Sequence, residues 1–157
     1  MPIIGLPAPQ FSVPAVISQN EIKTIDWKQF QGQWVVLFFY PFDFSELSAL
    51  EIKEMRQLLP DFKAQGCEVL GVSIDSSFAH VAWIQELGDL GFPLLSDITK
   101  NMSRDYDAIL EEEGVSTRAT YIIDPKGLIQ YISLQNLQTV RNFNEVLRVL
   151  KSLKMQK

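Results

Sequence analysis

The sequence holds a single cysteine, Cys67, and a single histidine, His80. One thiol cannot form a disulfide within the chain, so a fold stapled by intrachain disulfides is excluded. Zinc sites built from several cysteine and histidine ligands are excluded for the same reason. The carboxylates are scattered, and the acidic run Glu111–Glu113 is typical of a solvated surface. We therefore predict no metal site and no bound cofactor.

Long apolar runs and clusters of basic residues are also missing. No stretch approaches the roughly 20 residues that a membrane-spanning helix needs, and the N-terminus lacks the pattern of a secretory signal. The net charge is −5 and the 14 Lys and Arg residues are scattered, which argues against nucleic acid and membranes as partners. We expect neither membrane insertion nor nucleic-acid binding. The expected location is the cytoplasm, or an organelle stroma or matrix if a transit peptide was removed.

A strand, a turn and a helix dominate what is present. Trp34–Tyr40 is a continuous apolar run, which predicts a central strand buried on both faces. After a turn containing Pro41, apolar residues recur at helical spacing up to Leu58. Pro60 is expected to kink or divide this helix, and Gly66 to end it.

Strands and helices alternate along the remainder, which predicts an α/β layer structure in a single domain over residues 1–157. The expected elements are a hairpin of Phe11–Val16 with Glu21–Ile25, a turn Trp27–Phe30 capped by Asp26, strands Cys67–Ile74 and Phe92–Ser96, helices Phe78–Leu87 and Asn101–Ile109, a hairpin of Thr117–Asp124 with Leu128–Leu134, and a final helix with an apolar stripe from Phe143 to Leu153.

The central stretch carries a recognisable signature. Phe38–Pro41, Asp43–Ser45 and Ser48–Ile52 resemble the FFYP-x-DF-T-x-x-C-P-T-E-I signature of peroxiredoxins of the alkyl hydroperoxide reductase and thiol-specific antioxidant (AhpC/TSA) type, typical 2-Cys-like. The resemblance continues in Ile3–Phe11 and in Cys67–Ile84, and it covers essentially the whole chain. It implies a thioredoxin-like fold with the N-terminal hairpin and insertions of peroxiredoxins, built on a central mixed sheet flanked by helices.

The resemblance also implies which residues form the site. Ser48 occupies the position of the peroxidatic cysteine, and Pro41 matches the proline of the motif. Ser45 matches the hydroxyl residue that hydrogen-bonds the peroxide. Arg118 matches the arginine that lowers the pKa of the thiol, and Glu51 matches the glutamate of the signature.

A serine cannot replace that thiol. Its hydroxyl stays protonated at neutral pH, and it has no sulfenic acid stage through which it could be recycled. Ala49 and Leu50 replace the proline and threonine that follow the cysteine in the signature. Three adjacent changes favour natural loss of the active site over one engineered Cys→Ser replacement. Without a catalytic role, Ser48 is expected to cap the helix, because Ser48-x-x-Glu51 has the form of a capping box.

Two other chemistries are not favoured. Cys67 begins an apolar strand, where a cysteine is expected to be a buried and unreactive hydrophobe. Ser48, His80 and Asp75 could make a hydrolase triad, but no G-x-S-x-G sequence surrounds Ser48. We interpret His80 as a structural residue.

Two functions remain open. The first is a peroxiredoxin-like protein without peroxidase activity, acting as a binding or assembly module or as an accessory subunit. The alternative is an active peroxiredoxin, reducing hydrogen peroxide or alkyl hydroperoxides, whose nucleophile was replaced by Ser48 through engineering. We expect a homodimer or another protein complex. The contact would be edge to edge through Leu128–Leu134 or through a face that includes Phe42 and Phe44.

Overall fold

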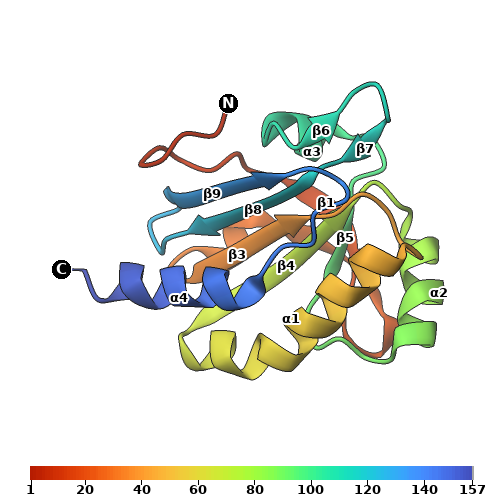
Figure 1. Cartoon of the computed structure of the whole chain (residues 1–157), viewed down its shortest axis with the longest axis horizontal. Coiled ribbons are helices and arrows are strands. Elements are labelled where there is room, and N and C mark those ends of the chain that lie inside the picture. Colours follow the sequence, from red (N-terminus) through yellow and green to blue (C-terminus); the bar gives the residue numbers. More distant parts are fainter. Residues whose placement is uncertain (157) are drawn as a thin grey trace.

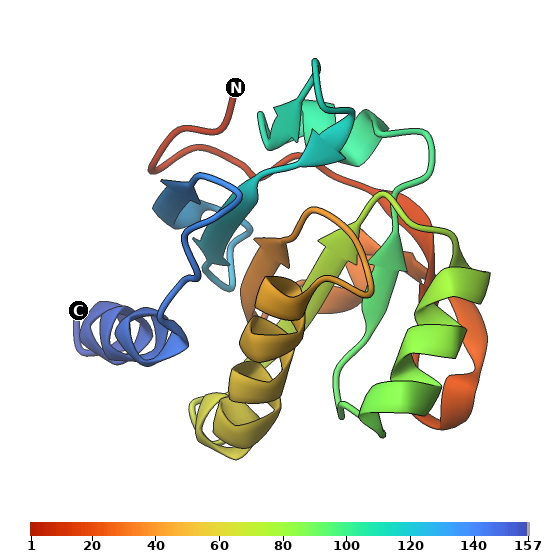
Figure 2. The ribbon, with the colours of Figure 1, turned by 45° about the vertical axis from the view of Figure 1, so that its right-hand side comes forward.

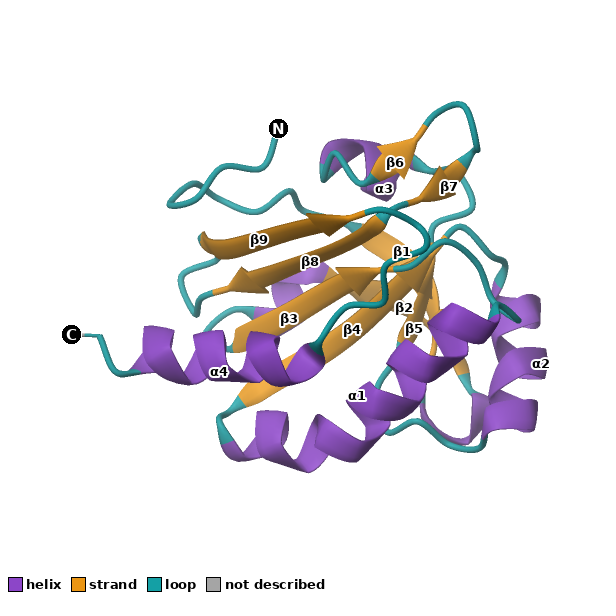
Figure 3. Cartoon of the chain, in the orientation of Figure 1, coloured by secondary structure: helices purple, strands orange, loops and turns teal. Residues whose placement is uncertain are grey.

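The structure, a computed structural model, describes residues 1–156, and this part forms a seven-stranded mixed sheet, a two-stranded ribbon and four α-helices (Figures 1 and 3). The strands are β1 (Ser12–Val16), β2 (Ile22–Asp26), β3 (Trp34–Phe39), β4 (Cys67–Ser73), β5 (Leu94–Ser96), β6 (Ile109–Leu110), β7 (Val115–Ser116), β8 (Arg118–Ile123) and β9 (Ile129–Gln135). The helices are α1 (Glu46–Ala64), α2 (Ser77–Leu87), α3 (Asn101–Asp105) and α4 (Phe143–Lys154), with 3-10 turns η1 (Ser18–Asn20) and η2 (Trp27–Phe30).

Strand β3 is the centre of the sheet, whose order is β2-β1-β5-β4-β3-β8-β9. It pairs in parallel with β4 and antiparallel with β8. Successive side chains of a strand point to opposite faces, and both faces of β3 are buried, as predicted. Val35, Leu37 and Phe39 belong to one core, while Val36 and Phe38 belong to the other.

The two faces of the sheet are covered differently. Apolar side chains of α1, α2 and α4 fill the core that contains Phe38, and Figure 2 shows α1 and α2 in front of the sheet, with α4 at its left. The opposite core is closed by η2, by Met102 of α3 and by Tyr106. The predicted mixed sheet flanked by helices is confirmed.

One expected detail is wrong, and one of the two alternatives for Pro60 is excluded. The helix predicted over Asn101–Ile109 ends at Asp105. Asp107 adopts a left-handed φ of 54°, which breaks the helical path and directs Ile109 into β6. Pro60 does not divide α1, which continues to Ala64. Gly66, with a φ of 70°, follows the end of that helix as expected.

The topology brings distant segments together at one end of the sheet. The carboxyl end of β3 leads into the loop that precedes α1. Strand β8 runs antiparallel to β3, with Thr120 opposite Phe38. Its first residue, Arg118, therefore lies beside the carboxyl end of β3, close to the start of α1.

Candidate functional site

Helix α1 begins with Ser45 as its N-cap. The Oγ of Ser45 accepts a hydrogen bond from the backbone amide of Ser48 at 3.2 Å. Ser48 therefore lies inside the first turn, and the predicted capping box of Ser48 and Glu51 is wrong. The carboxylate of Glu51 turns instead toward two buried guanidinium groups, which bind it more strongly than a neutral amide would.

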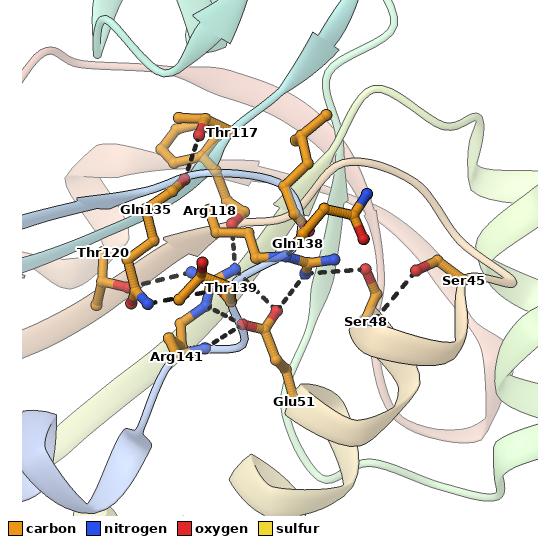
Figure 4. A network of polar contacts seen from close by, with 12 residues as sticks. Ser45, Ser48, Glu51, Thr117, Arg118, Thr120, Gln135, Gln138, Thr139 and Arg141 are labelled. Atoms are coloured by element: carbon orange, nitrogen blue, oxygen red, sulfur yellow. Dashed lines mark hydrogen bonds and ion pairs between the residues drawn. The ribbon is translucent and has the colours of Figure 1, made fainter.

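Arg118 contacts two of the other predicted site residues. Its Nη1 donates to the Oγ of Ser48 at 3.2 Å and to Oε1 of Glu51 at 2.6 Å (Figure 4). Its Nε donates to the carbonyl oxygen of Leu137 at 2.7 Å. The side chain of Arg118 is only 2% exposed. The structure thus brings Ser48, Glu51 and Arg118 into one hydrogen-bonded group.

Arg141 completes this group, and sequence reasoning missed it. Its Nε donates to Oε2 of Glu51 at 2.8 Å, and its terminal nitrogens donate to the carbonyl oxygens of Ala119 and Phe39. Burial lowers the pKa of Arg141, Glu51 opposes that effect, and the charge of Arg118 adds to it. No sequence motif includes Arg141, and an arginine just before a helix is ordinarily expected to lie on the surface.

A cavity of about 480 Å³ opens in front of this group. Pro41, Ser45 and Arg118 line it, so the remaining predicted site residues also lie together. The other lining residues are Phe42, Glu46, Leu47, Leu137 and Gln138. Ser48 itself is fully buried, behind the residues that line the cavity.

A second polar network lies on the α2 side of the same loop. One carboxylate oxygen of Asp43 accepts from the Tyr40 hydroxyl, and the other pairs with Nδ1 of His80, both at 2.7 Å. Nε2 of His80 pairs with the carbonyl oxygen of Leu95 at 2.9 Å. Both ring nitrogens are therefore occupied, and His80 pairs with Asp43, so the Ser48–His80–Asp75 triad is not assembled. Burial raises the pKa of Asp43, while its hydrogen bond with His80 opposes this shift.

Asp75 belongs to this second network. Its Oδ2 accepts from the Asp43 amide at 2.8 Å and from the Ser73 hydroxyl at 2.6 Å. Asp43, Asp75 and His80 offer ligand atoms within 4.8 Å of one another, a juxtaposition that the sequence analysis did not predict. These atoms are used in hydrogen bonds within the protein. Their arrangement anchors the loop between β3 and α1 against α2.

Cys67 lies at the opposite end of the sheet. It is paired in register with Trp34, the first residue of β3, whereas the cavity lies beyond the last residue. Six strand residues correspond to roughly 20 Å. Burial raises the pKa of the Cys67 thiol from 9.0 to about 12. The expectation that this cysteine is a buried and unreactive hydrophobe agrees with both observations.

The chain is similar to known proteins over nearly its full length. It matches the AhpC/TSA family over residues 4–132. Peroxiredoxin-2 of Rattus norvegicus is 41% identical over 155 residues, covering 95% of this chain and 78% of that protein. The reduced 2-Cys peroxiredoxin of Plasmodium vivax superposes with a TM-score of 0.93 at 35% identity, covering 96% of this chain and 81% of its own. For Mycobacterium tuberculosis AhpC the TM-score is 0.89 at 35% identity, with coverages of 98% and 93%.

These likenesses confirm the predicted thioredoxin-like fold with peroxiredoxin insertions. Within residues 1–156, no helix is both long and apolar enough to cross a membrane. The family match covers well over half of the chain, and the relatives exceed the identity at which family membership is secure. The chain therefore belongs to the AhpC/TSA family of peroxiredoxins.

Proposed function

We propose that this chain is a peroxiredoxin family member without peroxidase activity, which acts as a binding or assembly module. The observation that carries the proposal is the environment of Ser48. Its hydroxyl receives the hydrogen bond from Arg118 at 3.2 Å, at the position where the signature places the peroxidatic cysteine. A hydroxyl there forms no sulfenic acid and cannot enter the redox cycle of the family.

Arg118, which hydrogen-bonds Ser48, cannot act as the base that deprotonates its hydroxyl. Arg118 is a guanidinium, which donates hydrogen bonds and cannot accept a proton. His80 is engaged with Asp43 and with Leu95, so it is not free to act as a general base. Cys67 does not substitute, because its thiol is buried and remains protonated near neutral pH. These features support a protein that keeps the fold and has lost the chemistry.

The alternative is an active peroxiredoxin whose cysteine was replaced by engineering. The hydrogen-bonded group of Arg118, Glu51 and Arg141 favours it, because these charged residues beside position 48 are still paired with one another. Ala49 and Leu50 oppose it, since an engineered trap would leave the residues after the cysteine unchanged. Determining codon 48 of the natural gene decides between the two.

The activity test uses the purified protein with thioredoxin, thioredoxin reductase, NADPH and hydrogen peroxide. We expect NADPH to be oxidised no faster than by the reducing system alone. Cys67→Ser serves as the matched control, because it removes the only thiol. Peroxide turnover that persists in Cys67→Ser and disappears in Ser48→Ala would contradict the proposal.

We also propose that the protein forms a homodimer or another protein complex, and two surfaces support this. β9 is an edge strand of the sheet, and residues 5–8 cover only its beginning, through Gly5 and Leu6 hydrogen bonds to Ile129. An uncovered edge is a template for pairing with another chain. The second surface carries exposed Phe42, Phe44 and Phe78, on two segments that Asp43 ties together.

Light scattering at tens of micromolar protein tests the assembly. We expect a mass above that of the monomer, and we expect either Leu134→Lys on the edge or Phe78→Glu on the aromatic surface to reduce it. Leu134 is 59% and Phe78 79% exposed, so both variants should fold. A monomeric mass for the unaltered protein, with no partner recovered, would contradict this part of the proposal. The cytoplasm, or an organelle stroma or matrix, stays our prediction for its location.

A further inference from the structure

The group behind the cavity holds more positive than negative charge. Arg118 and Arg141 are 2% and 3% exposed, and among residues 1–156 both pair with one carboxylate, that of Glu51, which is 1% exposed. Both guanidinium groups stay protonated. Ser48 contributes no charge. One buried positive charge is therefore left without a counter-ion inside the group, which is a costly state unless an anion neutralises it.

Arg118 has an unused donor beside the cavity. Its Nε and Nη1 have acceptors, but its Nη2 has none among residues 1–156 (Figure 4). In the same part of the chain, no fully buried side-chain nitrogen lacks a partner. Nη2 must therefore keep contact with solvent, and the cavity that Arg118 lines provides that contact.

The start of α1 supplies further donors to the same cavity. The amide of Ser48 is bonded to Ser45, whereas the amides of Glu46 and Leu47 have no acceptor within the described residues. Both residues line the cavity. The N-terminus of this 19-residue helix adds the positive end of its macrodipole, which favours an anion. The cavity is thus lined by three residues that each keep a donor without an acceptor among residues 1–156, next to a charge that the group does not neutralise.

The remaining walls indicate what kind of anion fits. Pro41, Phe42 and Leu137 give the cavity an apolar side, and its volume of about 480 Å³ exceeds the space that a simple ion needs. Glu46 lines the same cavity and is exposed, so its carboxylate repels ligands that carry several negative charges. A single negative group joined to a short apolar chain matches these walls.

We propose that this cavity binds a small monocarboxylate. Its carboxylate accepts from Nη2 of Arg118 and from the first amides of α1, and its aliphatic chain packs against Pro41, Phe42 and Leu137. The inference rests on the proposed function, because a thiolate at position 48 would neutralise the charge that the ligand neutralises here. A carboxylate suits the arginine because its two oxygens match the planar guanidinium.

Sodium butyrate is the probe, with butyramide as its uncharged analogue and sodium chloride at equal ionic strength as the salt control. We expect a saturable response in calorimetry, together with changes in the amide NMR signals of Glu46 and Leu47. Butyramide should bind with an affinity at least about tenfold lower than that of butyrate, because it loses a charge-assisted hydrogen bond. Equal responses to butyrate and butyramide, or to butyrate and chloride, would overturn the proposal.

Two substitutions at one position test the charge argument. Ser48→Asp places a carboxylate beside Arg118, and we expect it to weaken butyrate binding about tenfold or more and to raise the melting temperature. Ser48→Asn is neutral and should keep the binding. Arg148→Gln, which removes an exposed guanidinium on α4, is the control for general electrostatic effects. Unchanged butyrate binding in Ser48→Asp would overturn the proposal.

Failure of this inference is distinguishable from failure of the proposed function. Butyrate binding is measured without peroxide or reductant, and peroxide turnover is measured without carboxylate. If turnover is absent and butyrate does not bind, the ligand proposal alone is wrong. If Ser48-dependent turnover is found, the proposed function is wrong whatever butyrate does.

Discussion

Ser48 and Cys67 are both buried, yet the protein surrounds them with opposite chemistry. Ser48 lies in the first turn of α1 and receives a hydrogen bond from Arg118. Cys67 begins β4 among apolar side chains, and its Sγ donates to the backbone carbonyl of Glu68 at 3.3 Å. The chain thus keeps its only thiol where burial raises the pKa to about 12, and places a hydroxyl where cations and a helix N-terminus would favour a thiolate.

The difference shows that burial alone does not decide how reactive a thiol is. Loss of solvent disfavours the charged form at both positions. Only position 48 has a permanent positive charge within hydrogen-bond distance and the free amides of a helix start to offset that penalty. The two positions can therefore be compared within one protein, and the surroundings of each can be altered separately by mutation.

The largest loss of stability is expected when the buried ion pairs beside Ser48 are removed. Glu51→Ala removes the carboxylate that pairs with both Arg118 and Arg141, and leaves two buried guanidinium groups without their partner. We expect the free energy of unfolding to fall by about 3–5 kcal/mol, as for other buried ion pairs that lose one member. Urea denaturation followed by circular dichroism measures this change.

Glu145→Ala is the matched control for that variant. Glu145 also pairs with an arginine, Arg148, at 2.7 Å, but both side chains lie on the surface of α4. Water solvates the arginine that remains, so we expect no measurable change in stability. Similar losses in the two variants would mean that the buried group around Glu51 is no stronger than a surface pair.

A thiol placed at position 48 can be compared directly with the natural thiol at position 67. In the variant Ser48→Cys made in a Cys67→Ser background, the thiol at position 48 should have a pKa roughly one to three units below the usual value of about 8.5. The physical reason is that Arg118 and the amides of α1 stabilise the thiolate. The ultraviolet absorbance of the thiolate, followed against pH, gives the midpoint directly.

A midpoint at or above the usual value would show that the pocket no longer stabilises an anion. Ala49 and Leu50 make this a demanding test, because the proline and threonine of the signature are absent from the turn. The same result would also argue against carboxylate binding in the cavity, since both depend on the same donors.

The sequence predicted the fold and most of the pocket because both follow from local patterns. The apolar run Trp34–Tyr40 identified the central strand, and the resemblance to the peroxiredoxin family identified Pro41, Ser45 and Arg118. Proximity of these residues then follows from the antiparallel pairing of β3 with β8. Such pairing is what a match to a known family supplies.

Residues that depend on long-range contacts were not predictable in this way. Arg141 is separated from Glu51 by 90 positions, and nothing near it in the sequence indicates that it is buried. The pairing of Asp43 with His80 spans 37 positions and depends on how α2 packs on the sheet. The capping role of Ser48 was predicted wrongly because Ser45 and Ser48 both suit a helix start, and only the backbone geometry distinguishes them.

The smallest effect concerns Cys67 and is seen only in alkaline solution. Its pKa is raised on folding from 9.0 to about 12, so its contribution to stability is complete below the unfolded value. As the pH rises above that value, the unfolded chain releases the thiol proton while the folded chain retains it, and stability is lost. We expect the free energy of unfolding of the unaltered protein to fall by about 1.4 kcal/mol per pH unit relative to Cys67→Ala above roughly pH 9.

The buried tyrosines Tyr40, Tyr106 and Tyr121 are present in both proteins, so the difference between the two proteins isolates the thiol. Urea denaturation of both proteins between neutral and alkaline pH measures it. A constant difference across this range would mean that the Cys67 thiol ionises as readily in the folded chain as in the unfolded one, and the contrast between positions 48 and 67 would then rest on Arg118 and the amides of α1.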